Sequence, residues 1–260
     1  MSLTIGADPE LFLSNAAGKF ISSIGKFGGT KAAPQPLSIA KGCAVQEDNV
    51  ALEFNIPPAK TEDDFVGSIT AALDELRQLA FMQDLSLAIK ASAVFDADQL
   101  DNPVAKMFGC TPDYNAWTGK RNPQPKGTRT QLRSCGGHIH FGYPADSVAI
   151  RDLVRACDLF IGAPLTQLDG DNQRRSLYGR AGAYRPCTYG MEYRTPSNYW
   201  LTDESLVRFV YQSAHRAYNY CLSGLPSLEA ERELILAAID EENFEAFTEL
   251  DKRYGIRFYD

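Results

Sequence analysis

Four short apolar stretches of this chain each carry two polar or charged side chains spaced two residues apart. The pairs are Asp8 and Glu10, Glu53 and Asn55, His138 and His140, and Glu192 and Arg194. Residues i and i+2 of a strand point to the same side of a sheet, so each pair shares a face. Burying such groups is costly unless cations or hydrogen bonds compensate. The pattern therefore predicts a sheet face that holds divalent metal and phosphate, and it indicates an enzyme.

The individual residue types point to the kind of metal. Asp8 and Glu10 lead into an apolar strand, and carboxylate oxygens suit hard divalent cations. His138 is a candidate ligand because imidazole is the commonest protein ligand for metals, and His140 is either a ligand or its hydrogen-bonded neighbour. Glu192, between Met191 and Tyr193, is the candidate ligand of the C-terminal half.

Arginines concentrate near Glu192. Arginine suits bidentate contacts with phosphate or carboxylate, and the segment contains Arg174, Arg175, Arg180, Arg185 and Arg194. A solvated run of charge is the alternative, but the interleaved tyrosines argue against it. Arg180, Arg185 and Arg194 are therefore predicted to bind the phosphates of a substrate, together with His140. Lys31 is a further candidate for an anionic substrate, although its GKFGGTK sequence lacks the spacing of a nucleotide P-loop.

Composition limits the class of protein. The 260 residues are 44% hydrophobic and 23% charged, as in an ordinary globular protein, and we expect one domain over residues 1–260. The net charge of −7 argues against a general nucleic-acid binder. The six cysteines lie far apart without a CxxC pair, so we expect reduced thiols: Cys43, Cys110, Cys135, Cys157, Cys187 and Cys221. With no signal peptide or membrane span in the sequence, we expect a cytoplasmic protein.

Hydrophobic periodicity predicts an α+β protein. Strands are expected over residues 3–13, 86–95, 135–143 and 189–195, and residues 43–56 are expected to form a strand pair or one long bent strand with its turn at Asp48 and Asn49. Helices are expected over 62–84, 147–169 and 228–250, and another begins at a Thr202 cap. The stretches 101–133 and 170–186 are predicted loops that border the active site, and at least one of them is expected to become ordered when ligand binds.

Three motifs resemble a known superfamily. GADPELFL, GGHIHFG and GMEYRTPSNYW occur in the same order as the metal-binding strands of glutamine synthetases and glutamate-cysteine ligases. With DNVALEFNIPP between the first two motifs, the chain most resembles the small carboxylate-amine ligases of some bacteriophages. The resemblance implies a curved, mainly antiparallel sheet with helices packed on its outer face, like the glutamine synthetase catalytic domain.

The resemblance also implies a reaction. Such ligases use ATP and Mg²⁺ or Mn²⁺ to join a carboxylate to an amine through an acyl phosphate, releasing ADP. By correspondence, Glu10 and Glu53 hold one metal, and Asp8, His138 and Glu192 hold a second. Arg185, Arg194 and Glu53 are the predicted catalytic residues. The expected partners are small-molecule or peptide acids and amines, with neither membrane nor nucleic acid.

Three other classes use similar residues. A two-metal phosphohydrolase has the same kind of carboxylate and histidine cluster. A zinc enzyme would rely on His138 and His140 with one carboxylate. An inactive relative would bind nucleotide without turnover.

Overall fold

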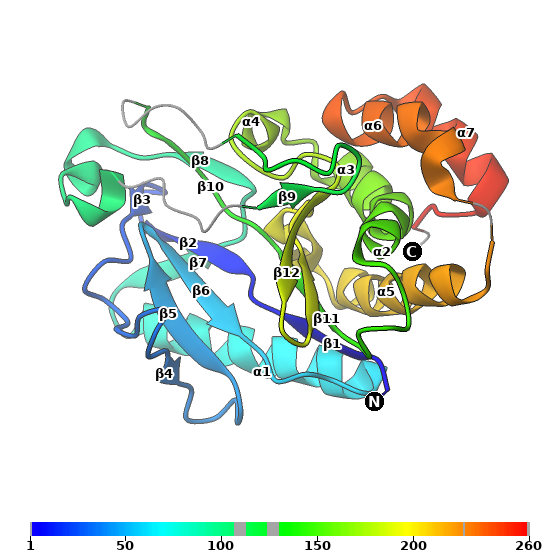
Figure 1. Cartoon of the computed structure of the whole chain (residues 1–260). Helices are drawn as coiled ribbons and strands as arrows, with labels where there is room; N and C mark the ends of the chain where they lie inside the picture. The colour runs from blue at the N-terminus through cyan, green and yellow to red at the C-terminus, as the bar shows by residue number, and fades with distance from the viewer. Residues whose placement is uncertain (1, 107–112, 124–129, 226, 259–260) are drawn as a thin grey trace.

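The computed structural model describes residues 2–106, 113–123, 130–225 and 227–258. Its strands build a curved sheet (Figure 1). They are β1 (Thr4–Ala7), β2 (Glu10–Asn15), β3 (Phe20–Ile21), β4 (Gln35–Pro36), β5 (Ala44–Asp48), β6 (Ala51–Asn55), β7 (Leu85–Ala88), β8 (Ser92–Val94), β9 (Tyr114–Asn115), β10 (Leu132–Ser134), β11 (Ile139–Gly142), β12 (Ala183–Cys187) and β13 (Gly190–Tyr193).

Within the described residues every strand pairing is antiparallel. One part of the sheet has the order β1-β11-β13-β12-β9, and another has β3-β2-β6-β5-β4 with β7 also on β2. Backbone bonds at the β1–β2 junction join the two parts: Asp8 N donates to His138 O (3.3 Å) and Phe54 N donates to Pro9 O (3.1 Å). The β1–β2 junction therefore lies between the segment that carries His138 and the strand that carries Glu53.

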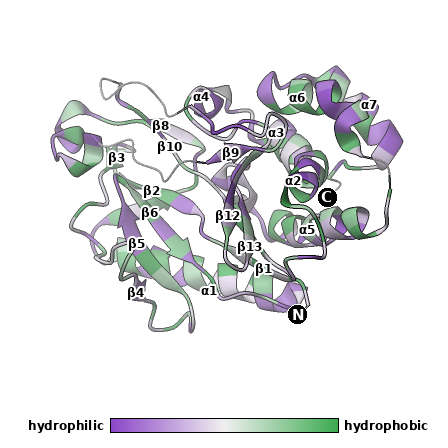
Figure 2. Ribbon diagram, in the orientation of Figure 1, coloured by the Kyte–Doolittle hydropathy of each residue, from purple (hydrophilic) through white to green (hydrophobic). Residues whose placement is uncertain are grey.

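The helices are α1 (Glu62–Phe81), α2 (Ile150–Cys157), α3 (Ala163–Asp169), α4 (Asn172–Arg175), α5 (Glu204–Leu222), α6 (Arg232–Asp240) and α7 (Phe244–Tyr254). Green and purple alternate around α6 and α7 in Figure 2, as expected for amphipathic helices. Phe65 of α1 and Val210 of α5 belong to the same core as Leu11 and Leu52 of the sheet. The predicted α+β class, with a curved antiparallel sheet and helices on its outer face, is confirmed.

Several element boundaries differ from the prediction. The first helix ends at Phe81, and the 147–169 segment begins its helix at Ile150 and contains a π-helical turn over Asp158–Gly162. The predicted strand 86–95 is divided between β7 and β8, which pair with different strands. Asp203, not Thr202, caps α5, since its side chain accepts from Ser205 N. The 228–250 segment forms two helices because Glu242, with a positive φ of 53°, interrupts it.

Other local predictions are confirmed. β5 and β6 form a hairpin whose turn contains Asn49, at a φ of 55°. Thr61 caps α1 by accepting from Asp64 N at 3.1 Å. Short elements interrupt the predicted 101–133 loop, of which residues 107–112 and 124–129 lie outside the described parts. No helix among the described residues is both long and apolar enough to cross a membrane.

Candidate active site

Alternation along the strands separates the candidate site from the core. On β11, Ile139 and Phe141 are fully buried in the core shared with the helices, while His138, just before the strand, and His140 belong to the opposite face. On β13, Met191 and Tyr193 enter the same core, and Glu192 lies directly opposite His140. The strand period of two therefore places the polar residues together on the face away from the helices.

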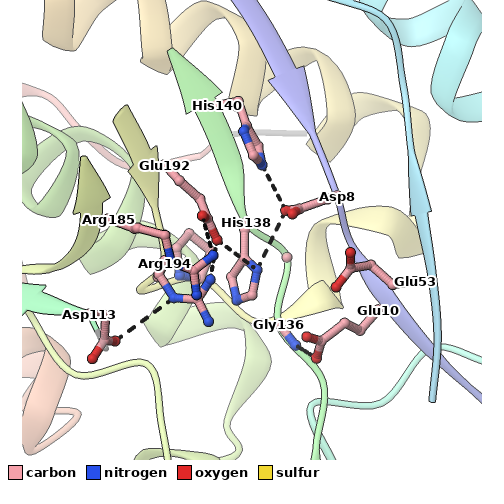
Figure 3. A network of polar contacts seen from close by, with 12 residues as sticks. Asp8, Glu10, Glu53, Asp113, Gly136, His138, His140, Arg185, Glu192 and Arg194 are labelled. Carbon is pink, nitrogen blue, oxygen red and sulfur yellow. Dashed lines mark hydrogen bonds and ion pairs between the residues drawn. The ribbon is translucent and has the colours of Figure 1, made fainter. Parts of the chain in front are cut away.

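A first cluster consists of Asp8, His138 and Glu192, whose ligand-type atoms lie within 4.8 Å of one another. His138 Nδ1 is 3.5 Å from both Asp8 Oδ1 and Glu192 Oε1 (Figure 3). His140 Nε2 is 2.9 Å from the same Asp8 oxygen, and its Nδ1 contacts the Tyr189 hydroxyl. His140 therefore contacts the first cluster through Asp8 without being one of its three members.

Glu192 is shared with two arginines. Arg185, its cross-strand neighbour on β12, places Nη1 2.7 Å from Glu192 Oε2. Arg194 pairs with the other carboxylate oxygen, and its Nε lies 3.8 Å from Asp113 Oδ2. The two guanidinium groups thus lie beside a candidate metal ligand. Arginines in this position suit a phosphate group bound next to the metal.

The charges of the first cluster determine its protonation. Burial would raise the pKa of Asp8, but the adjacent His140 and His138 outweigh burial and lower it. Burial, assisted by the positive charge of Arg194, lowers the pKa of His138 to about 4. At neutral pH the cluster therefore contains an ionised Asp8 and a neutral His138 imidazole, which are the forms that bind metal.

A second cluster consists of Glu10, Asp48 and Glu53, also within 4.8 Å of one another. Gly136 N donates to Glu10 at 2.7 Å, and the Gln46 amide donates to Glu53. Desolvation and the charge of Asp48 raise the pKa of Glu10 to about 8. Desolvation and neighbouring carboxylates also raise the pKa of Glu53 well above its usual value. The three carboxylates therefore repel one another unless protons or a cation neutralise them.

Both clusters fit divalent cations. Asp8 Oδ1 and His138 Nδ1 are buried, and beyond their ion-pair contacts with each other, with His140 and with Glu192 neither atom has a hydrogen-bond partner. Three carboxylates at the second cluster offer only oxygen, the donor that Mg²⁺ and Mn²⁺ prefer. Glycine is required beside His138, because a Cβ on Gly136 would lie 2.2 Å from His138 Nε2.

Two cavities flank the clusters. One, of about 780 Å³, is lined by Asp8, Lys31, Glu53, His140 and Tyr189 among others, and we call it the Lys31 cavity. The other, of about 70 Å³, is lined by residues that include Glu10, Asp48, His138, Arg174 and Arg194, and we call it the Arg174 cavity. A larger cavity, of about 1020 Å³, lies among α5 and α7 and is lined by none of the candidate residues.

The structure brings most of the sequence-predicted residues to this face, with one exception. Lys31 lines the Lys31 cavity, and its charge partly offsets the desolvation that raises the pKa of Asp48. Arg180, by contrast, is exposed, and its Nε donates to Arg175 O at 3.4 Å. Its positive charge partly offsets the desolvation that raises the pKa of Asp240 on α6. Arg180 therefore does not join the two clusters.

Sequence reasoning missed Asp48 and Asp113. The Asp-Asn sequence predicts a turn at Asp48, but Asp48 ends β5 two residues after Gln46 and so lies on the same face as Glu53. That spacing was the available signal. Asp113 contacts Arg194 from a segment without hydrophobic periodicity, so no sequence pattern indicated it.

Arg133, Arg174 and Tyr178, from the two predicted border loops, line the Arg174 cavity. Arg174 is buried and donates to three backbone carbonyls at 2.7 to 2.9 Å: those of Cys135, Thr195 and Pro196. It thereby fixes the approach to β11 against the segment that follows β13. Ordering of these loops by ligand stays a prediction.

A comparison with known protein families agrees with the resemblance that the sequence motifs indicate. Residues 127–249 match the model of a family described as "Phage phiEco32-like COOH.NH2 ligase-type 2". The resemblance to carboxylate-amine ligases is thereby confirmed for this segment. The segment includes strands β11, β12 and β13 and the residues His138, Arg185, Glu192 and Arg194. No curated protein sequence is detectably similar to this chain.

Solved structures that resemble the chain include one described as a "novel glutamine synthase homolog", with 12% identity and a TM-score of 0.41. That match covers 96% of this chain and 66% of the other. A complex of GmaS with ADP has 12% identity and a TM-score of 0.41, covering 99% of this chain and 71% of the other.

Proposed function

We propose that the protein is an ATP-dependent ligase that joins a carboxylate to an amine through an acyl phosphate and releases ADP. The observation that carries this proposal is the placement of two metal-type clusters and the Arg185–Arg194 pair on one sheet face. The match of residues 127–249 to a ligase family supports it independently. The acids and amines are small molecules or peptides.

ATP is assigned to the Lys31 cavity. Its volume of about 780 Å³ lies within the range of small-molecule sites. Ile56, Pro58 and Tyr189 supply apolar surface for the nucleoside, while Lys31 and His140 supply positive charge or hydrogen bonds for phosphates. The carboxylate group of the acid is assigned to the Arg174 cavity, whose volume of about 70 Å³ suits that group alone.

Mg²⁺ or Mn²⁺ would be held by Glu10, Glu53 and Asp48 in one cluster and by Asp8, His138 and Glu192 in the other. When bound, these ions neutralise phosphate charge and orient the phosphoryl group. Oxygen predominates among the donors, and only His138 contributes nitrogen, which favours magnesium or manganese over zinc.

The reaction would then proceed in two steps, with Arg185 and Arg194 acting in the first. An oxygen of the acid attacks the γ-phosphorus, and the bond to the β-phosphate bridging oxygen breaks, giving an acyl phosphate and ADP. Arg194 and Arg185 stabilise the negative charge on the transferring group. The amine next attacks the acyl carbon, inorganic phosphate leaves with the former carboxylate oxygen, and the amine loses a proton.

The experiment is an ADP-release screen of paired acids and amines with Mg²⁺, followed by isotope analysis of the active pair. An acid labelled with ¹⁸O in its carboxylate should transfer one label to inorganic phosphate, and mass spectrometry should detect the amide. ADP formation without label transfer would contradict the acyl phosphate. Release of phosphate from a simple ester, independent of ATP and amine, would replace the ligase by a phosphohydrolase. Nucleotide binding without turnover for any pair would indicate an inactive relative.

A further inference from the structure

The Gly- and Pro-rich segment from Ser22 to Cys43 carries Lys31 and lies along the edge of β5. Within it, Thr30 and Ala33 form a tight turn: Thr30 N donates to Ala33 O at 3.0 Å, and Ala33 N donates to Thr30 O at 2.9 Å. Lys31 is at the tip of this turn. The sequence GKFGGTK before it is not a P-loop, so its glycines need another explanation.

Glu47 supplies that explanation. Its Oε2 accepts from Gly25 N at 2.8 Å, and its Oε1 accepts from the N–H groups of Lys26, Phe27 and Gly28 at 2.8 to 2.9 Å. Four successive backbone donors therefore surround one carboxylate. These bonds outweigh the effect of burial and lower the pKa of Glu47, so it is ionised at neutral pH.

The turn is fixed on both sides. Gly29 has a φ of +77°, and a Cβ there would lie 2.4 Å from Val45 O, so the segment lies directly against β5. After the turn, Gln35 of β4 pairs with Val45. Strand alternation explains the position of Glu47: Gln46 and Asp48 face the candidate site, and Glu47 between them points to the segment.

We propose that Glu47 is a positioning residue for the nucleotide: by fixing the residues before the Thr30–Ala33 turn, it holds Lys31 where its ammonium group meets the polyphosphate. This inference rests on the proposed function and on the assignment of ATP to the Lys31 cavity. Glu47 itself does not touch the nucleotide.

Glu75 of α1 provides a matched control. Its carboxylate also accepts four hydrogen bonds from the same segment, from the N–H and hydroxyl of Ser38 and from the N–H groups of Ile39 and Ala40, at 2.6 to 2.8 Å. These residues follow β4 and are absent from the lining of the Lys31 cavity. Glu75→Gln therefore perturbs the anchoring of the segment without loosening the residues immediately before Lys31.

The test is fluorescence titration of the folded variants with a ribose-labelled ATP analogue and Mg²⁺, which needs neither acid nor amine. We expect Lys31→Met and Glu47→Gln each to weaken binding about tenfold, as loss of a charge-assisted hydrogen bond does. The double variant should bind about as weakly as Lys31→Met alone, because Glu47 acts through Lys31. Glu75→Gln should change the affinity by less than about twofold.

Calorimetric titration with Mn²⁺ alone completes the test. It should give the same affinity for Glu47→Gln as for the wild type, which excludes an effect through the adjacent Asp48. Additive losses in the double variant, or an equal loss in Glu75→Gln, would overturn the positioning role while leaving the proposed function intact. A folded wild-type protein that binds no ATP analogue would instead overturn the proposed function, and this inference with it.

Discussion

Glu10 on β2 and Glu53 on β6 lie directly opposite each other, as a cross-strand pair of carboxylates. Like charges in such a pair destabilise a sheet. The pKa of Glu10, raised from 4.5 to about 8, gives the sign of the effect on folding. Its contribution to stability is complete below pH 4.5 and is lost as the pH rises through 8, because the folded state holds the proton more tightly than the unfolded state.

We therefore predict that metal-free protein loses about 2 kcal/mol of stability at this carboxyl between pH 6.5 and 8.5. Mg²⁺ should raise the melting temperature more at pH 8.5 than at pH 6.5, because at the lower pH it must displace protons. The pKa of Asp158, buried behind β13, is raised to about 7 and shifts stability in the same direction. Only the cluster should respond to Mg²⁺, so melting curves with and without Mg²⁺ separate the two. Equal Mg²⁺ stabilisation at both pH values would contradict the prediction.

Glu192→Gln should weaken Mn²⁺ binding at the Asp8–His138 cluster, because it removes a ligand charge. It should also remove the negative charge that orients Arg185 and Arg194, so ATP and metal affinities should fall together. Excess Mg²⁺ should partly restore ADP formation. Electron paramagnetic resonance of Mn²⁺ measures the change, and Glu249→Gln on α7 is the control. Unchanged Mn²⁺ affinity in folded Glu192→Gln would remove Glu192 from the ligand set.

Arg194→Ala should reduce turnover by about 10² or more, the usual effect of losing a preorganised charge that stabilises a transition state. Folding should be affected much less than turnover, so the melting temperature of Arg194→Ala should stay close to that of the wild type. Arg180→Ala is the matched control, since Arg180 is exposed and contacts Arg175 O. We expect it to retain turnover within about twofold. A large loss in Arg180→Ala would instead support the phosphate-binding role that the sequence predicted.

The cysteines should not take part in catalysis. Burial raises the pKa of each described cysteine, to about 11 for Cys43 and about 12 for Cys221, with upward shifts also for Cys135, Cys157 and Cys187. Protonated thiols are poor nucleophiles. Alkylation at pH 7 should therefore be slow, and activity should survive replacement by Ser or Ala apart from a loss of stability. Cys110 lies outside the described residues and belongs in the same test. Turnover lost in a folded single variant would reveal a nucleophile.

Strand alternation made much of the arrangement predictable. Pairs such as His138 and His140 alternate with Ile139 and Phe141, so the sequence alone separates the site face from the core face. How strands that are distant in the sequence approach one another is harder to predict, because it depends on pairings between residues far apart in the chain. Asp8 and His138 come together through a backbone bond across 130 positions, and only the order of the motifs hinted at it.

The missed features depend on long-range contacts or on local backbone geometry. Asp-Asn is a turn signal and predicts a turn at Asp48, although the same hairpin places the Asp48 carboxylate beside Glu53. Composition alone predicts the same role for Arg180 as for Arg185. Arg180 is exposed before β12, and Arg185 lies within that strand opposite Glu192, so similar sequence surroundings gave different environments. Composition does not carry this distinction.

The pairing of β12 with β13 has a consequence for how the site is formed during folding. His140, Glu192 and Arg185 lie side by side across three strands, and only Thr188 and Tyr189 separate β12 from β13. So short a loop sets the hairpin register. A slip by one residue would turn Glu192 toward the helices and Met191 toward the substrates. The geometry of the candidate site therefore depends on the register of this hairpin, and a residue inserted between Cys187 and Gly190 has to be absorbed in the loop if Glu192 is to keep facing His140 and Arg185.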